Sequence, residues 1–214
     1  MVISSEVSQL GLLTTDIFVF VDQPFIGKRD STFYSINDIA QDAIMIIVAI
    51  DPGIKNLGWS VYDTNQCRFK SFGRYNLLKD QPKTMHTKYP HLVYDFITAS
   101  KAVFDVADIV VIEIQMVAKF KVIQTAFQCF FWGKSHLISP RSVRCHFNIS
   151  TGNYAKNKKA SVDAIPKLNI TKQNKTWFDT LEVGKRDDVA DAILLGLYWV
   201  EKGAEKESKK RKRK

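Results

Sequence analysis

Residues 45–64 read MIIVAIDPGIKNLGWSVYDT, and they predict the first two strands of the folded domain. Its first part, MIIVAI (45–50), is a continuous apolar run rich in β-branched residues, which is typical of a strand buried on both faces. The run ends at Asp51, and the Pro-Gly pair that follows predicts a turn. LGWSVYDT (57–64) then alternates in character, so we expect a second strand that returns antiparallel to the first.

Further strands and helices are expected along the rest of the chain. CRFKSFGRY (67–75) alternates with basic residues on one face, and IVVIEI (109–114) is a second buried run that carries Glu113 near its end. Apolar residues between them, within 90–105, recur at helical spacing. The remaining expected elements are a helix over 119–132, a short strand over 135–139, a basic helix over 156–168 and a mostly buried helix over 187–200.

This order of elements predicts an α/β protein. Three strands joined by short turns form a meander, whereas the later strands are joined by helices, which implies parallel pairing. We therefore expect a five-stranded mixed β-sheet flanked by helices on both faces, which is the layout of the RNase H-like fold. The expected organisation is an N-terminal extension of unknown role (1–44), a folded domain (45–203) and a basic, disordered tail (204–214).

Composition restricts the class of protein. The 214 residues, 45% hydrophobic and 25% charged, suit one sizeable soluble domain with extensions. The longest apolar runs are too short to cross a membrane, and the N-terminus shows no secretory signal. The 3 cysteines lack C-x-x-C spacing and the 4 histidines are scattered, which favours an intracellular protein and argues against a disulfide scaffold or a zinc site.

Positive charge is concentrated near the C-terminal end of the chain. The net charge is +9. Residues 156–186 and 201–214 each carry eight Lys or Arg against three acids, while residues 187–200 carry three acids and no Lys or Arg. Localised basic charge suits a polyanionic partner such as nucleic acid, and the acidic stretch between the two blocks is not explained by a merely solvated basic surface.

Acidic residues occur where separate elements can bring them together. Asp51 and Glu113 stand at the ends of the two buried strands, and Asp188 and Asp191 are i, i+3 on one helix face. Neighbouring strands crossed by that helix would make the four carboxylates converge. Such a cluster is costly unless it is protonated or metal-bound, and oxygen ligands without His or Cys suit magnesium or manganese. Asp187 is the better candidate for a helix N-cap, and its contribution to metal binding stays open.

Four blocks of sequence carry a resemblance to a known family. They are IVAIDPGIKNLGWSVYD (47–63), VVIEIQ (110–115), GNYAKNKKASVDAI (152–165) and KRDDVADAILLGLYWV (185–200). Together they resemble the RuvC-like Holliday junction resolvases, most of all the poxvirus-type resolvases. The resemblance implies catalytic metal-ligand roles for Asp51, Glu113, Asp188 and Asp191. It also implies a functional lysine, for which Lys159 fits best and Lys158 is the runner-up.

The activity that this resemblance implies is that of a magnesium-dependent endodeoxyribonuclease, a crossover junction endonuclease. Such an enzyme cuts four-way DNA junctions by two-metal phosphodiester hydrolysis, in recombination, repair and the resolution of replicated viral DNA. Two Mg²⁺ ions per active site are implied, for which Mn²⁺ can substitute. The implied partners are branched DNA and a second copy of the chain in a homodimer, with the helix over 119–132 contributing to dimer and junction contacts; no membrane partner is expected.

Several alternatives stay open at the level of sequence. A non-catalytic DNA-binding module on the same fold, or a nuclease acting on RNA–DNA hybrids, would show similar patterns. An actin-like ATPase is disfavoured, because the chain lacks a second phosphate-binding glycine loop. KKRKRK (209–214) resembles a nuclear localisation signal but equally suits a DNA-holding arm, so the expected location is the nucleus or a cytoplasmic viral replication site.

Overall fold

The structure, a computed structural model, describes residues 45–79 and 86–211, with side chains described as far as Lys202. One mixed sheet has the strand order β3-β2-β1-β4-β5. Its strands are β1 (Ile46–Asp51), β2 (Leu57–Asp63), β3 (Arg68–Tyr75), β4 (Ile109–Glu113) and β5 (Ser135–Ile138). β1, β2 and β3 pair antiparallel, whereas β4 pairs parallel with both β1 and β5. The predicted five-stranded mixed sheet is therefore confirmed.

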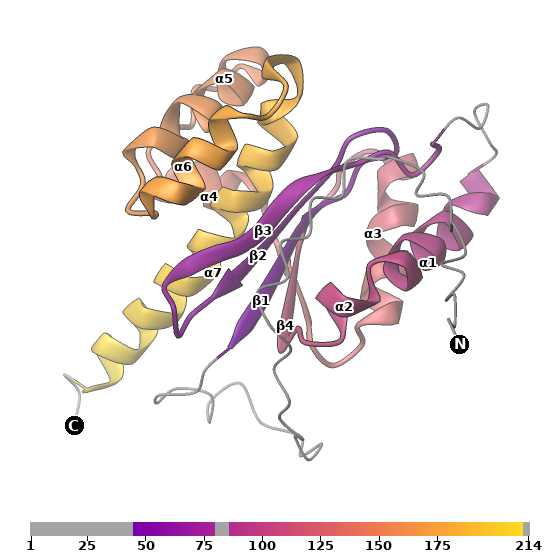
Figure 1. Ribbon diagram of the computed structural model, residues 1–214, viewed down its shortest axis with the longest axis horizontal. Helices are drawn as coiled ribbons and strands as arrows, with labels where there is room; N and C mark the ends of the chain where they lie inside the picture. The colour runs from indigo at the N-terminus through magenta and orange to yellow at the C-terminus, as the bar shows by residue number, and fades with distance from the viewer. Residues whose placement is uncertain (1–44, 80–85, 212–214) are drawn as a thin grey trace, which may run out of the picture.

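Helices cover both faces of this sheet (Figure 1). On one face lie α1 (Tyr89–Ala99), α2 (Lys101–Phe104) and α3 (Ala118–Phe130). On the other face lie α4 (Pro140–His146), α5 (Tyr154–Ala164), α6 (Lys172–Asp179) and the long α7 (Arg186–Arg211). Three short 3-10 turns, His86–Lys88, Ile165–Lys167 and Val183–Lys185, complete the described elements.

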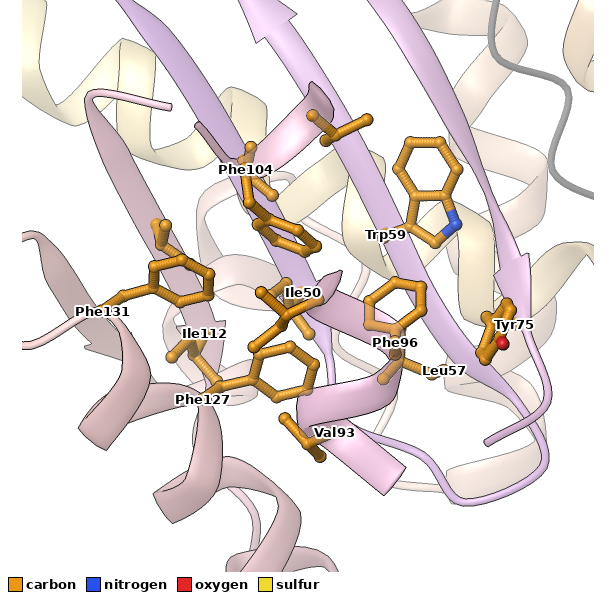
Figure 2. Packing of buried hydrophobic residues seen from close by; sticks show 14 of the residues in the cluster. Ile50, Leu57, Trp59, Tyr75, Val93, Phe96, Phe104, Ile112, Phe127 and Phe131 are labelled. Atoms are coloured by element: carbon orange, nitrogen blue, oxygen red, sulfur yellow. The ribbon is translucent and has the colours of Figure 1, made fainter. Parts of the chain in front are cut away.

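The two central strands are apolar at nearly every position because both of their faces are covered. Ile50 and Ile112 are buried among the aromatic side chains of α1, α2 and α3, as Figure 2 shows. On the other face, Ala49 and Val111 pack against α7. Burial on both faces removes the alternation of apolar and polar residues that marks a half-exposed strand, and it leaves the continuous runs seen in the sequence.

The structure differs from the sequence-based expectations in its helices. The predicted helical stretch over 90–105 is divided at Ser100 into α1 and α2. α4 and α6 were not predicted, because each is only two turns long and shows little periodicity. A disordered tail is predicted from residue 204, but the structure corrects this for residues 204–211, where α7 continues through Arg211. Ala, Glu and Lys in this stretch are strong helix formers. The predicted extension over 1–44 lies outside the described residues.

None of the helices in the described residues is both long enough and apolar enough to span a membrane.

Candidate active site

Asp51 and Glu113 are the last residues of two adjacent strands. β1 and β4 run parallel, with Ile50 paired to Ile112, so the carboxyl ends of both strands meet at the same edge of the sheet. Asp51 is also paired across the sheet with Gly58 of β2. The strand register, rather than the loops, therefore places these two carboxylates side by side.

The first turn of α7 reaches the same edge because β2 carries a glycine there. A Cβ atom at Gly58 would lie 2.1 Å from the carbonyl oxygen of Asp188, so any other residue would push the helix away. Further along, the Ser60 hydroxyl donates a hydrogen bond of 2.9 Å to the carbonyl of Ala192. This close crossing brings Asp188 and Asp191 over the end of β1.

The four acids line one cavity of about 590 Å³. Asp51, Glu113, Asp188 and Asp191 all contribute to its wall. The other charged or polar side chains that line it are Lys55, Asn56, Tyr89, Gln115, Lys119, Arg144, Tyr154, Asn157, Lys158 and Ser161. The structure thus brings together the acids that the sequence singled out, and it surrounds them with cations.

Crowding in this cavity disfavours the ionised form of Asp51 and Glu113. Burial, followed by the charges of Glu113, Asp191 and Asp188, raises the pKa of Asp51 well above its usual range, although the charge of Lys158 opposes the shift. Burial and the charge of Asp191 raise the pKa of Glu113 to about 8. A hydrogen bond between Asp51 and Glu113 partly offsets this repulsion. The pair therefore holds a proton when no cation is bound.

The pKa values of Asp188 and Asp191, in the first turns of α7, are shifted in the same direction. Burial and the neighbouring charge of Asp187 raise the pKa of Asp188 to about 6. Burial raises the pKa of Asp191, while a hydrogen bond from Ser161 and the charge of Arg144 lower it in part. Carboxyl groups that resist ionisation in a shared cavity are typical of a functional site.

Lys158, rather than Lys159, reaches the acids. The Lys158 ammonium contacts the Asp187 carboxylate and lies 3.5 Å from Asp188. Burial lowers the pKa of Lys158, but its hydrogen bond to Asp187 and the charge of Asp188 outweigh burial and raise it overall. Lys159 is exposed and is not part of the cavity wall. The position of Lys158 therefore favours the runner-up of the sequence analysis.

Two further residues of the cavity were not singled out from the sequence. Arg144, in α4, lies close enough to Glu113 and Asp191 to lower the pKa of both. Gln115, just beyond β4, donates hydrogen bonds to both Asp51 and Glu113. Arg144 lies outside the four blocks that carry the resemblance and gave no signal, whereas Gln115 closes the block VVIEIQ (110–115), two residues after Glu113.

The chemistry of the donor set fits a hard divalent cation. Four carboxylates share one cavity, and among the residues that the structure describes no His or Cys lines it. As the side chains stand, no three His, Cys, Asp or Glu residues of the described chain form a ready-made metal-binding group. In this arrangement Glu113 is hydrogen-bonded to Asp51, and Asp188 forms an ion pair with Lys158. Oxygen donors of this kind suit Mg²⁺ or Mn²⁺.

Known structures share this fold. The chain is similar to the fowlpox virus resolvase in a complex with Holliday junction DNA, with a TM-score of 0.55, 22% identity, and coverage of 74% of this chain and 98% of the resolvase. It is also similar to the yeast mitochondrial Holliday junction resolvase Ydc2, with a TM-score of 0.58, 15% identity, and coverage of 79% and 86%. Comparison with curated protein sequences finds no significant match.

The fold is therefore that of the RNase H-like resolvases. Residues 45–202 match the family model described as Poxvirus A22 protein, which spans most of the chain. The chain belongs to the Poxvirus A22 protein family.

Proposed function

We propose that this protein is a structure-selective endonuclease that cuts four-way DNA junctions. The observation that carries the proposal is the convergence of Asp51, Glu113, Asp188 and Asp191 around one cavity bordered by Lys158 and Arg144. Carboxylates can hold metal ions that activate water, and the cations can bind the phosphodiester that is cut. Membership of the family and the fold shared with two junction resolvases support the choice of four-way junctions as substrate.

Magnesium ions are the proposed cofactor, two per active site, with manganese as a substitute. When bound, they supply an activated water and positive charge at the leaving oxygen. Asp51 faces the charges of Glu113, Asp188 and Asp191, which supports assigning it as the ligand that both ions would share. Glu113, Asp188 and Asp191 would complete the ligand sets. Their raised pKa values mean that cations replace protons on binding.

Lys158 is the proposed functional lysine. Its contacts with Asp187 and Asp188 keep the ammonium protonated, so it acts as a fixed positive charge on the scissile phosphate rather than as a proton donor. Asp187 holds this ammonium in place and is not part of the cavity wall. Arg144 is the second cation positioned beside the acids, and we assign it to the same phosphate group.

A homodimer is the proposed active form, because a four-way junction needs two symmetric cuts and each chain holds one site. The catalytic unit is residues 45–203, and residues 1–44 have no assigned role. Residues 204–214 hold seven Lys or Arg, which suits an arm that binds DNA. The site of action is the nucleus or a cytoplasmic site of viral DNA replication.

The test is cleavage of a labelled four-way junction by the purified chain. We expect symmetric cuts with magnesium, none with a chelator, and little cutting of a duplex of matched sequence. Asp51→Asn is expected to bind the junction without cutting it, because the residue contacts metal rather than DNA. Binding without cleavage by the wild-type chain would instead indicate a non-catalytic DNA-binding module. Preferential cutting of an RNA–DNA hybrid would change the proposed substrate.

A further inference from the structure

Gln115 spans the two carboxylates at the strand ends. Its side-chain nitrogen Nε2 lies 3.2 Å from Oδ1 of Asp51 and 3.2 Å from Oε1 of Glu113. A primary amide carries two hydrogens, so one nitrogen can donate to both acids at once. Because carboxylate oxygens accept, the nitrogen and not the oxygen of the amide faces them.

Gln115 is itself held by a buried glutamine of α3. The backbone N–H of Gln115 donates to Oε1 of Gln124 at 2.8 Å. Gln124 is only 8% exposed, between Ile123 and Phe127 on the apolar side of the helix. A buried polar side chain is costly unless it is hydrogen-bonded, so its presence on this face requires an explanation.

The orientation of Gln124 follows from the same contacts. A backbone N–H can only donate, so the oxygen of Gln124 must face Gln115, and its nitrogen then donates to Oε1 of Gln128 at 3.3 Å. The hydrogen bond between Gln124 and the backbone of Gln115 holds that residue at the end of β4, where its side chain reaches the two acids.

We propose that Gln115 is a positioning residue for metal binding, which sets the spacing and orientation of the Asp51 and Glu113 carboxylates, and that Gln124 fixes Gln115 for this purpose. The inference rests on the proposed function, because it takes the two acids as metal ligands. Once the two groups lose the proton that they share, the two carboxylates repel each other and would rotate apart. The shared amide offsets that repulsion and presents both groups to one cation site.

A purely structural role predicts a different outcome. If Gln124 only anchors the loop after β4, loss of the Gln115 side chain leaves the backbone hydrogen bond intact and changes neither the stability nor the metal affinity. If the amide positions the acids, metal affinity falls although the protein remains folded. Partners of this kind around metal ligands typically contribute about 10- to 100-fold in metal affinity.

Calcium binding to the metal-free, full-length protein is the experiment, measured by isothermal titration calorimetry. Gln115→Met keeps the length of the side chain and removes its donor, and we expect Ca²⁺ affinity to fall by about 10-fold or more. Gln124→Leu is expected to shift the affinity in the same direction. Gln128→Ala is the matched control, since it leaves the bond between Gln124 and Gln115 in place, and it is expected to bind Ca²⁺ as the wild type does.

Junction binding in chelator is measured in parallel and is expected to be unchanged in all three variants. Unchanged or tighter Ca²⁺ binding by Gln115→Met would overturn the inference. Should that variant fail to fold, Gln115→Asn, which is one methylene too short to span both acids, is subject to the same criterion. A wild-type protein that neither binds Ca²⁺ nor cuts junctions would overturn the proposed function itself. If the wild type binds Ca²⁺ and cuts junctions, and Gln115→Met binds Ca²⁺ with the same affinity, only the role of Gln115 would be overturned.

Discussion

Replacing Glu113 with glutamine should stabilise the metal-free protein while it abolishes cleavage. In the folded chain, the pKa of Glu113 is raised from 4.5 to about 8, so the buried carboxyl keeps its proton at neutral pH. In the unfolded chain the same group is ionised above pH 4.5. Glutamine has a similar shape and stays neutral in both states. Its amide can still accept from Gln115 and donate to Asp51, so the local hydrogen bonds are preserved.

The sign and size of the effect follow from proton linkage. Between pH 4.5 and 8 the folded chain binds more protons than the unfolded chain, so wild-type stability falls as pH rises through this window. One pKa unit corresponds to about 1.4 kcal/mol, so the penalty at pH 7 is at most about 3 kcal/mol. Because Glu113 shares its proton with Asp51, the penalty in stability is smaller than this upper value. Glu113→Gln removes the penalty, and we expect a rise in Tm of several degrees, up to about 10 °C, at pH 7 and none at pH 4.5.

The assay is thermal unfolding followed by circular dichroism, in chelator, at pH 4.5, 6 and 7.5. Asp95→Asn is the matched control, because Asp95 is exposed on α1. We expect this variant to show the same change in Tm between pH 4.5 and 7.5 as the wild type. A gain of equal size at every pH, or a loss of stability at pH 7.5, would refute the reasoning. Either result would mean that burial and the neighbouring acids do not raise the pKa of Glu113 in the folded protein.

Four further outcomes are expected. Ca²⁺ should raise the Tm of the wild type more at pH 8 than at pH 6, because fewer protons are then displaced, and it should do so much less in Asp51→Asn, as thermal unfolding would show. Lys158→Ala should lower the single-turnover cleavage rate at saturating protein by roughly 100-fold, whereas Lys159→Ala cuts at the wild-type rate. Gly58→Ala should cost about 1–3 kcal/mol in urea unfolding and reduce cleavage, because its Cβ displaces α7. Deleting residues 204–214 should flatten the salt dependence of junction binding in a titration, since each lost phosphate contact removes nearly one unit of log–log slope.

The strands of the sheet could be predicted because their sequences report burial directly. MIIVAI is apolar throughout and IVVIEI is apolar except for Glu113, and both prove to be central strands covered on both faces. The short helices α4 and α6 could not be predicted, since two turns offer too few residues to establish a helical period. The charge content of the C-terminal residues predicts disorder from 204, whereas α7 continues through Arg211, since Glu, Lys and Ala also favour helix.

The choice of lysine shows the limit of the sequence. Lys158 and Lys159 are adjacent, and on a helix adjacent residues point about 100° apart. Which one faces α7 depends on the rotation of α5 about its axis, and in the structure Asn157, Lys158 and Ser161 line the cavity whereas Lys159 does not. The motif is compatible with either residue, so only the packed structure separates them.

The strands, the acids at their ends and the acids at the start of the last helix can be recognised from the sequence alone. These features are local, because they depend on periodicity, burial and chemistry within one segment. The close crossing of α7 over β2 at Gly58, which brings all four acids into one cavity, is visible only in the packed structure. The same holds for the presence of Gln115 and Arg144 in that cavity. Distances between segments far apart in the chain depend on how whole elements pack, and no single segment encodes them.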